Sequence, residues 1–400
     1  MRKKVIYIII FLFLLILAVM AGYYFFFLKK APAGEADIGG FPTFPGGTLP
    51  PLEDGDEISL PVGGDEETTL PRLRQLSSEP TAGAGFVSLG SKAVAVRYID
   101  RATGNAYEAD LNSPRKTRLS NNTIPKIYEA VWSADGTKIF LRYLREDNQI
   151  ETFGATISKT AASTSPKTLT GTYLVRDINW LAVSPENDKI FYLTETAFGS
   201  DGIKAEPNGG GRVLLFESPL KEWLIDWPTK DTITVATKPA AGIFGHIYTL
   251  NAKTGELRKL VSDIGLTAKL SPDGKKILYS SGGRNSAILK TQALKDGNER
   301  TLTATLSDKC VWGKDSIVLL CGIPQGLPSG QYPDSWYQGI VSFNDSVWSF
   351  DTDNGIGKEI WSPSAEDGEF DIYEPKISPD GEFLIFINKN DLTLWVLRIK

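Results

Sequence analysis

The chain has 400 residues, with 48 acidic residues against 43 Lys and Arg, 38 Gly, 23 Pro and 10% aromatic residues. Five of the basic residues and none of the acids lie in residues 1–30, so the rest of the chain has a net charge of about −10. Such an acidic body repels a phosphate backbone, and we expect no nucleic-acid partner. One His and two Cys are too few for an ordinary zinc site. A Ser-His-Asp hydrolase would depend on His246 alone, which we expect to be an ordinary surface or strand-edge residue.

Residues 5–28 form an uncharged, strongly apolar run that is long enough to cross a bilayer as a helix. Three basic residues precede the run and two follow it, so the positive-inside rule predicts a cytoplasmic stub at residues 1–4. The chain is then a single-pass protein of the plasma (inner) membrane, with its bulk outside the cytoplasm. The alternative is a cleaved signal peptide, because residues 19–21 resemble a cleavage site, but the apolar run is longer than a typical signal core.

Residues 29–70 are rich in Pro, Gly and acidic residues, and positions 31–70 contain no Lys or Arg. Such a stretch cannot bury enough apolar surface to offset the entropy lost on ordering. We therefore predict a disordered linker between the membrane helix and the rest of the chain.

From residue 71 onward, one unit of strand, tight turn and strand recurs. The turn is often Ser-Pro-Asp-Gly, in which Pro fixes φ, Asp bonds its own backbone and Gly accepts a positive φ. A second hairpin follows each copy, so the unit is a four-stranded antiparallel sheet of about 40–45 residues, the length of a propeller blade. The turns are centred near residues 90, 135, 187, 230, 273, 314 and 380. This spacing predicts an all-β fold, a seven-bladed β-propeller over residues 71–400, although copies one, four and six depart from the motif.

The two ends of the repeat region complement each other. The last copy stops after three strands, at residues 392–399, and an orphan strand-like segment at 71–77 precedes the first copy. That orphan resembles the outer strands expected at 115–120 and 257–262. We expect it to complete the seventh sheet and close the ring, which removes exposed strand edges.

The Ser-Pro-Asp-Gly units, each followed by a strand such as Ile277-Leu278-Tyr279, resemble the WD-like propeller repeats of TolB-type proteins. The resemblance covers about residues 71–400. It implies a fold rather than an activity, because such propellers host many binding roles and some enzymes.

The longest interruption of the repeat is the connection between the second and third strands of blade six, at residues 322–344. Loops of this length are usually functional or disordered. This one contains Tyr332, Trp336, Tyr337 and Phe343, whose residue types are common in binding hot spots. The alternative is that these aromatic side chains cover the hydrophobic edge of their own blade.

The crossover from blade six to blade seven lies on the same face and is acidic, with Glu366, Asp367, Glu369 and Asp371. An acidic loop beside an aromatic one would favour a cationic partner or a stacking ligand such as a sugar. We predict these eight residues of the two loops as partner-binding, and we predict no catalytic, cofactor-binding or metal-binding residue.

Three further patterns favour structural roles. Residues 351–355 resemble the start of a calcium loop but lack the Glu that ends one, so we expect a turn. Cys310 and Cys321 lie on adjoining strands and could pair outside the cytoplasm, or lie diagonally as two buried thiols, which we favour. Four tryptophans are expected at one position of the repeat, packed in the core or between blades: Trp132, Trp180, Trp227 and Trp312.

The leading functional hypothesis is a membrane-tethered, extracytoplasmic propeller that acts as a protein-interaction or scaffold module. The alternative is a sensor that binds a carbohydrate or cell-wall ligand through the central funnel or the Trp336 loop. A third class is a hydrolase with paired carboxylates, which needs no histidine. We find no distinctive paired-carboxylate motif and predict that the chain is not an enzyme. Carboxylates from different blades meeting at the ring centre would argue against that prediction.

Overall fold

A computed structural model describes residues 70–89, 94–121, 123–158 and 168–400. The predicted cytoplasmic stub, the membrane helix at 5–28 and all but the last residue of the linker at 29–70 lie outside these residues. Among the residues that the structure describes, no helix is long and apolar enough to cross a membrane.

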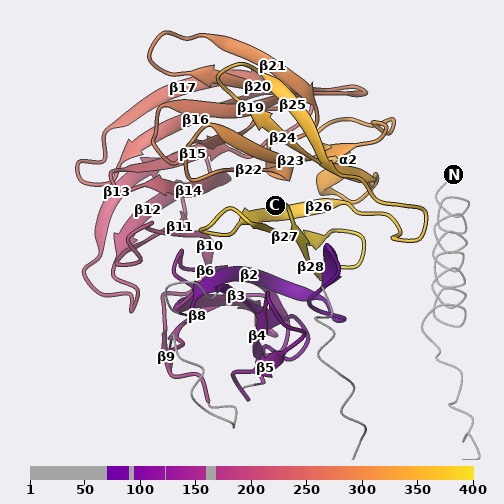
Figure 1. Cartoon of the computed structure of the whole chain (residues 1–400). Helices are drawn as coiled ribbons and strands as arrows, with labels where there is room; N and C mark the ends of the chain where they lie inside the picture. The colour runs from indigo at the N-terminus through magenta and orange to yellow at the C-terminus, as the bar shows by residue number, and fades with distance from the viewer. Residues whose placement is uncertain (1–69, 90–93, 122, 159–167) are drawn as a thin grey trace, which may run out of the picture. The chain divides into compact units, whose positions relative to one another are not determined.

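The described residues form seven four-stranded antiparallel sheets (Figure 1). The first strands of the sheets, which face the central channel, are β2 (Thr81–Ser88), β6 (Ile127–Trp132), β10 (Ile178–Val183), β14 (Trp223–Thr229), β18 (Thr267–Leu270), β22 (Cys310–Trp312) and β26 (Ile372–Ile377). The second strands are β3 (Val94–Asp100), β7 (Lys138–Leu144), β11 (Ile190–Thr196), β15 (Thr232–Thr237), β19 (Lys276–Gly283), β23 (Val318–Pro324) and β27 (Phe383–Asn388).

The third strands are β4 (Ala106–Asp110), β8 (Ile150–Thr156), β12 (Gly199–Ala205), β16 (Phe244–Asn251), β20 (Ser286–Ala293), β24 (Asp345–Asp351) and β28 (Leu394–Arg398). The outer strands are β5 (Lys116–Arg118), β9 (Gly171–Tyr173), β13 (Val213–Ser218), β17 (Leu257–Ile264), β21 (Glu299–Ala304), β25 (Ile356–Trp361) and β1 (Leu73–Gln75). Two short helices accompany blade six, the 3₁₀ turn η2 (Ser307–Lys309) and α2 (Asp334–Tyr337). The predicted seven-bladed propeller is confirmed.

The Ser-Pro-Asp-Gly turn works as its residues predict. In blade five, the Ser271 hydroxyl donates to Asp273 Oδ1 at 2.7 Å and accepts the backbone N–H of Lys276 at 2.9 Å. Gly274 has φ +72°, a conformation that residues with a side chain rarely adopt. The turn therefore fixes the hairpin of β18 and β19 through local contacts alone.

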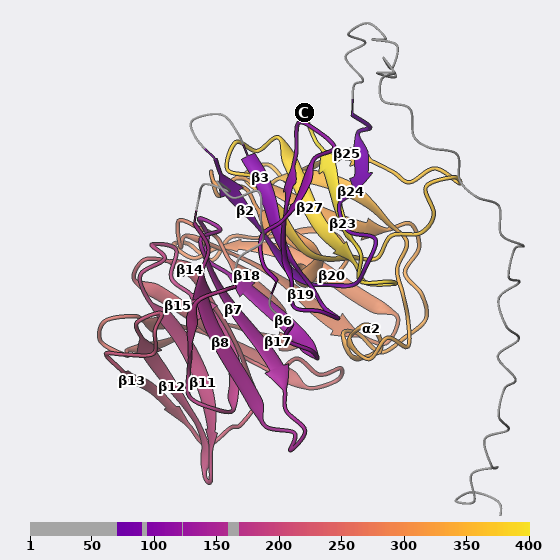
Figure 2. The ribbon, with the colours of Figure 1, turned by 90° about the horizontal axis from the view of Figure 1, so that it is seen from below.

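The N-terminal strand closes the ring. β1 pairs antiparallel with β28, with Leu73 opposite Leu397 and Gln75 opposite Trp395. One core cluster combines Val96 and Tyr98 of blade one with Ile385 and further residues of the C-terminal blade. In Figures 1 and 2 the yellow C-terminal strands lie next to indigo β2 and β3. The predicted closure is confirmed, and it ties the two ends of the propeller together.

The two faces of the ring carry different connections. The turns between first and second strands lie on one face, and the loops between second and third strands lie on the other, together with the crossovers between blades. We call this second face the channel-mouth face. β1 runs antiparallel to β28, so the chain enters the ring at the opposite face, beside Arg398.

Candidate binding site on the channel-mouth face

The long insertion of blade six lies flat across the channel-mouth face. The Asp334 carboxylate at the start of α2 accepts the backbone N–H of Ala241 in blade four at 3.0 Å. The backbone N–H of Tyr332 donates to Gly283 of blade five at 2.9 Å. The Lys389 ammonium of blade seven donates to the Trp336 carbonyl at 2.7 Å. The insertion of blade six thus contacts blades four, five and seven.

Glycine in blade five permits this close approach. A Cβ atom at Gly282 would lie 2.3 Å from the Tyr332 carbonyl oxygen, well inside van der Waals contact. A side chain at this position would lift the insertion off the blade.

The aromatic residues predicted to meet a partner are mostly buried. Tyr332 and Trp336 are 0% exposed and Phe343 is 1% exposed, whereas Tyr337 is 39% exposed. Trp336 stacks on Phe343 with ring centroids 6.2 Å apart. In this structure Tyr332, Trp336 and Phe343 cannot contact a partner, because packing beneath the insertion encloses them. The alternative stated above, that such aromatics cover their own blade, describes these three residues.

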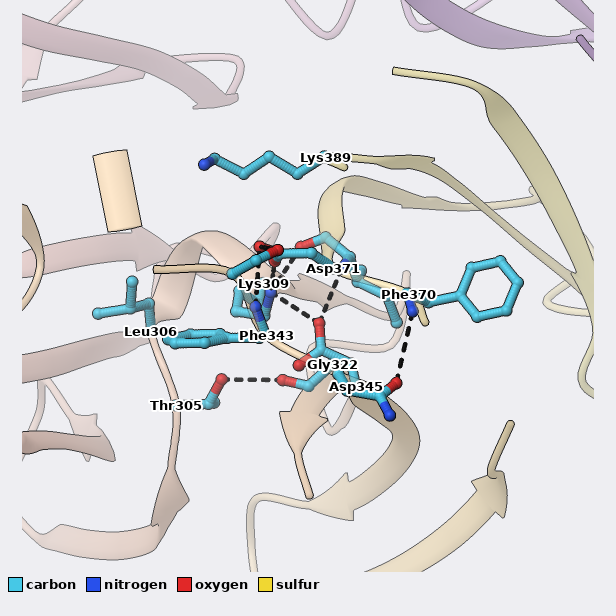
Figure 3. Close-up of polar contacts among 12 residues, drawn as sticks. Thr305, Leu306, Lys309, Gly322, Phe343, Asp345, Phe370, Asp371 and Lys389 are labelled. Carbon is cyan, nitrogen blue, oxygen red and sulfur yellow. Dashed lines mark hydrogen bonds and ion pairs between the residues drawn. The ribbon is translucent and has the colours of Figure 1, made fainter. Parts of the chain in front are cut away.

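The insertion is fixed by a buried lysine (Figure 3). Lys309, 0% exposed, donates to Asp371, to Asp345 Oδ2 at 2.7 Å and to the Ile372 carbonyl at 3.1 Å. All three donors of its ammonium are therefore used. The ammonium also lies 4.7 Å from the centroid of the Phe343 ring, so the charge packs directly against the insertion.

The Asp371 carboxylate completes this network. It accepts the indole N–H of Trp336 at 2.9 Å and the backbone N–H of Phe343 at 3.1 Å. The aromatic and acidic loops do meet, as predicted, but Asp371 is 0% exposed and serves as an anchor for the insertion.

The cluster holds two carboxylates for one lysine. Burial raises the pKa of Asp345 to about 6, and Asp371 adds to the rise while Lys309 opposes it. Asp345 Oδ1 is buried without a hydrogen-bond partner. Asp345 therefore changes protonation near pH 6.

The other acidic residues of the crossover are exposed. Glu366, Asp367 and Glu369 lie at the surface before β26. The backbone N–H and hydroxyl of Ser364 donate to Asp367 and lower the pKa of that carboxyl. These three residues and Tyr337 remain accessible, and their predicted role in partner binding stays a prediction.

Beside the insertion, the channel-mouth face opens into a pocket of about 740 Å³. Its walls come from blades one, two, three, four and seven, and include Arg101, Arg142, Trp180, Lys238 and Glu374. The lining combines aromatic, aliphatic and charged side chains of both signs. This mixture is typical of a binding site, in which apolar area supplies affinity and a few polar groups orient the ligand.

Trp180 is the aromatic side chain that reaches this pocket most openly. It is 37% exposed, whereas Trp132, Trp227 and Trp312 are 7%, 5% and 7% exposed. The prediction that all four share one position is wrong for Trp180, which lies three residues before the position that Val183 occupies in its blade. The offset places Trp180 near the start of β10, at the channel mouth, instead of beside the turn.

The pocket floor contains polar atoms without partners. Among the described residues, Thr81 Oγ1, Tyr128 OH and Arg142 Nε are buried and unpaired, and all three residues line the pocket. Burial raises the pKa of Tyr128 to about 12, so its hydroxyl stays protonated. Sequence reasoning missed this group, because its members come from three separate strands.

Carboxylates from different blades meet at the pocket, because Glu129 of blade two and Glu374 of blade seven both line it. Burial raises the pKa of Glu129, and repulsion from Glu374 contributes to the rise. Loss of hydration likewise raises the pKa of Asp226. Loss of hydration lowers the pKa values of Lys269 and Lys376, which donate to backbone carbonyls. Paired acids and bases of this kind are frequent at functional sites.

Three smaller predictions have plain outcomes. Cys310 and Cys321 lie directly opposite each other and form a disulfide, so the preference for diagonal thiols is wrong. Asp351 accepts the backbone N–H of Asp353 at 2.9 Å within the expected turn. His246 lies on β16, half-buried, with Nδ1 2.5 Å from the Ser262 hydroxyl. Within the described residues, no group of three or more His, Cys, Asp or Glu side chains is placed to hold a metal ion.

Known structures share the architecture. The chain is similar to an oligogalacturonate lyase from Vibrio parahaemolyticus, with TM-score 0.54 and 10% identity over 82% of this chain and 93% of that one. It is similar to an oligogalacturonate lyase in complex with manganese, with TM-score 0.53 and 12% identity over 80% and 90% of the two chains. TolB from Acinetobacter baumannii matches with TM-score 0.41 and 15% identity over 79% of each chain. No protein-family model and no curated protein sequence matches the chain.

The fold is established by the seven sheets themselves. The prediction that the chain is not an enzyme is overturned, because oligogalacturonate lyases are enzymes built on this fold. The approach of Glu129 and Glu374, from blades two and seven, also removes the argument from missing paired carboxylates. At 10–12% identity the likeness shows the fold alone and names no reaction for this chain.

Proposed function

We propose that this protein is a membrane-tethered, extracytoplasmic propeller that captures a protein partner on its channel-mouth face. One observation carries the proposal: large apolar side chains are exposed on the loops of that face in blades three and four. Phe198 is 91% exposed, Ile243 63%, Phe244 62% and Leu220 50%. Large apolar side chains exposed on one face favour a protein interaction site.

Charged pairs between these side chains suit a protein interface. Lys221 pairs with Glu195, and Lys238 pairs with Glu222 at 2.6 Å, in the connections between the apolar loops. An apolar centre with charged neighbours is the usual composition of an interface, where the charges orient the partner.

Two observations support the location and orientation. The disulfide between Cys310 and Cys321 belongs to an oxidising compartment, as an extracytoplasmic domain would require. The chain enters the ring on the face opposite the pocket. A tether attached there leaves the channel-mouth face free for a partner.

The test is affinity capture from membranes with the full chain and with a Phe198→Ser, Phe244→Ser double variant. We expect the double variant to fold normally and to lose the partners that the parent retains. The matched control is Ile356→Ser, because Ile356 is 65% exposed on outer strand β25, away from the proposed surface. Equal capture by parent and double variant would reject the proposal.

Carbohydrate binding is the second candidate. The observation that favours it is the exposed indole of Trp180 within a pocket of otherwise mixed polarity. Aromatic faces pack well against the apolar faces of sugar rings, so the pocket and the apolar loops can serve different ligands.

A further inference from the structure

We propose that the part of the pocket bounded by blades one to three binds one neutral, polyhydroxylated ring, such as a hexose unit of a glycan. The ring would stack on Trp180 and hydrogen-bond to the side chains of Thr81, Tyr128 and Arg142. This proposal deepens the carbohydrate candidate and does not depend on the protein partner.

Unpaired donors at the pocket floor are the first argument. Arg142 and Thr81 are each 2% exposed, and each has a polar atom without a partner. Tyr128 adds an unpaired hydroxyl from the neighbouring strand. A buried polar atom without a partner is costly, and such atoms in a native protein call for an explanation. The three atoms are themselves buried, so a ligand oxygen reaches them only when these side chains turn toward the pocket; all three groups can then donate a hydrogen bond to it.

The charge of the floor selects a neutral ligand. Arg142 already pairs with Glu129 and donates to the backbone carbonyls of Ile178 and Asn179. Its Nε donor, which has no partner, therefore belongs to a pair whose charge is balanced. An anionic ligand group would gain little net attraction to this pair and would be repelled by the Glu129 carboxylate. A neutral hydroxyl is not repelled in this way.

The wall next to the floor fits a ring. Arg142 donates to the backbone carbonyl of Asn179, the residue before Trp180. This hydrogen bond holds the Arg142 side chain next to the strand that carries the indole. Leu144, 41% exposed, adds an apolar edge from the same blade as Tyr128. A sugar ring can direct its hydroxyls to the floor of the pocket and its apolar carbon face to the indole of Trp180. A simple ion cannot do both.

The experiment uses the full chain in lipid nanodiscs, because detergents with sugar headgroups would compete. The probe is a printed panel of neutral oligomers of glucose, mannose, galactose and N-acetylglucosamine, with uronic-acid oligomers of matched length. We expect binding to at least one neutral oligomer. Trp180→Ala should weaken that binding about tenfold or more, and Tyr128→Phe or Thr81→Val by roughly three- to tenfold each.

A second measurement separates binding from folding. Tyr128→Phe removes a hydroxyl that has no partner in the free protein, so the melting temperature should stay the same or rise while sugar binding falls. Binding restricted to uronic-acid oligomers, silence across the panel, or parental binding by Trp180→Ala would each overturn the proposal. The Phe198→Ser, Phe244→Ser variant should keep sugar binding. The sugar-binding result can therefore be interpreted even if the protein-partner proposal fails.

Discussion

The two halves of the channel-mouth face differ in whether a loop covers them. Over blades five to seven the insertion covers the surface, and the Lys309 ammonium beneath it has a protein acceptor for each of its donors. Over blades one to three the face is open, and Thr81, Tyr128 and Arg142 keep atoms without partners. Aromatic and charged residues crowded into one loop therefore need not mark a binding surface. The better candidate is the open half, because Asp345 Oδ1 beneath the insertion is also unpaired but is enclosed.

The largest expected effect is at Lys309. Lys309→Met leaves two buried carboxylates without their cation, and we expect the free energy of unfolding of residues 70–400 to fall by about 3–5 kcal/mol. Urea unfolding measures it. Lys230→Met is the matched control, because Lys230 pairs with Glu186 at 2.7 Å on the exposed surface and its loss should have little effect. A similar loss in both variants would show that the buried cluster contributes no more stability than a surface ion pair.

The pH dependence of stability tests the same cluster. The pKa of Asp345, raised from 3.8 to about 6, means that the folded state binds this proton more tightly than the unfolded state. The free energy of unfolding should therefore fall as pH rises from about 4 to about 6, by up to about 3 kcal/mol. Asp345→Asn should remove this component. The measurement is the difference between parent and variant in urea unfolding at several pH values, and identical slopes would refute the assignment to Asp345.

Reduction of the disulfide comes next. The bond closes a short loop between β22 and β23, so breaking it should lower the free energy of unfolding by about 2–3 kcal/mol. Thermal melting with and without dithiothreitol measures the loss. A Cys310→Ala, Cys321→Ala variant should melt at the same temperature in both buffers, and a parent protein indifferent to reductant would contradict the expectation.

The smallest stability effect is expected in the open half. Trp180→Ala removes a side chain that is 37% exposed and should change the free energy of unfolding by less than about 1 kcal/mol. Trp132→Ala should cost about 3–5 kcal/mol, because Trp132 is 7% exposed and packs in the core of blade two. Equal losses in a melting experiment would show that Trp180 is a packing residue after all.

Local patterns predicted the fold well, because each blade is specified by short-range contacts. The Ser271 turn and its relatives are determined by neighbouring residues, and the regular spacing of the unit predicted the number of blades. Even the ring closure was visible, since an incomplete last blade and an orphan segment near Leu73 complement each other. The site was less predictable. Trp336 and Asp371 were correctly placed near each other, but their burial depends on where blades four, five and seven lie.

Seven blades, their order, the closing strand and the loops that share a face could all be predicted from the residues, because turn chemistry is local and the unit repeats at a regular spacing. The packing of the insertion on blade five, the burial of Lys309 and the exposure of Trp180 in a pocket could be seen only in the folded chain. Burial and hydrogen-bond pairing depend on side chains brought together from distant blades. Burial and pairing therefore cannot be predicted from a local sequence pattern.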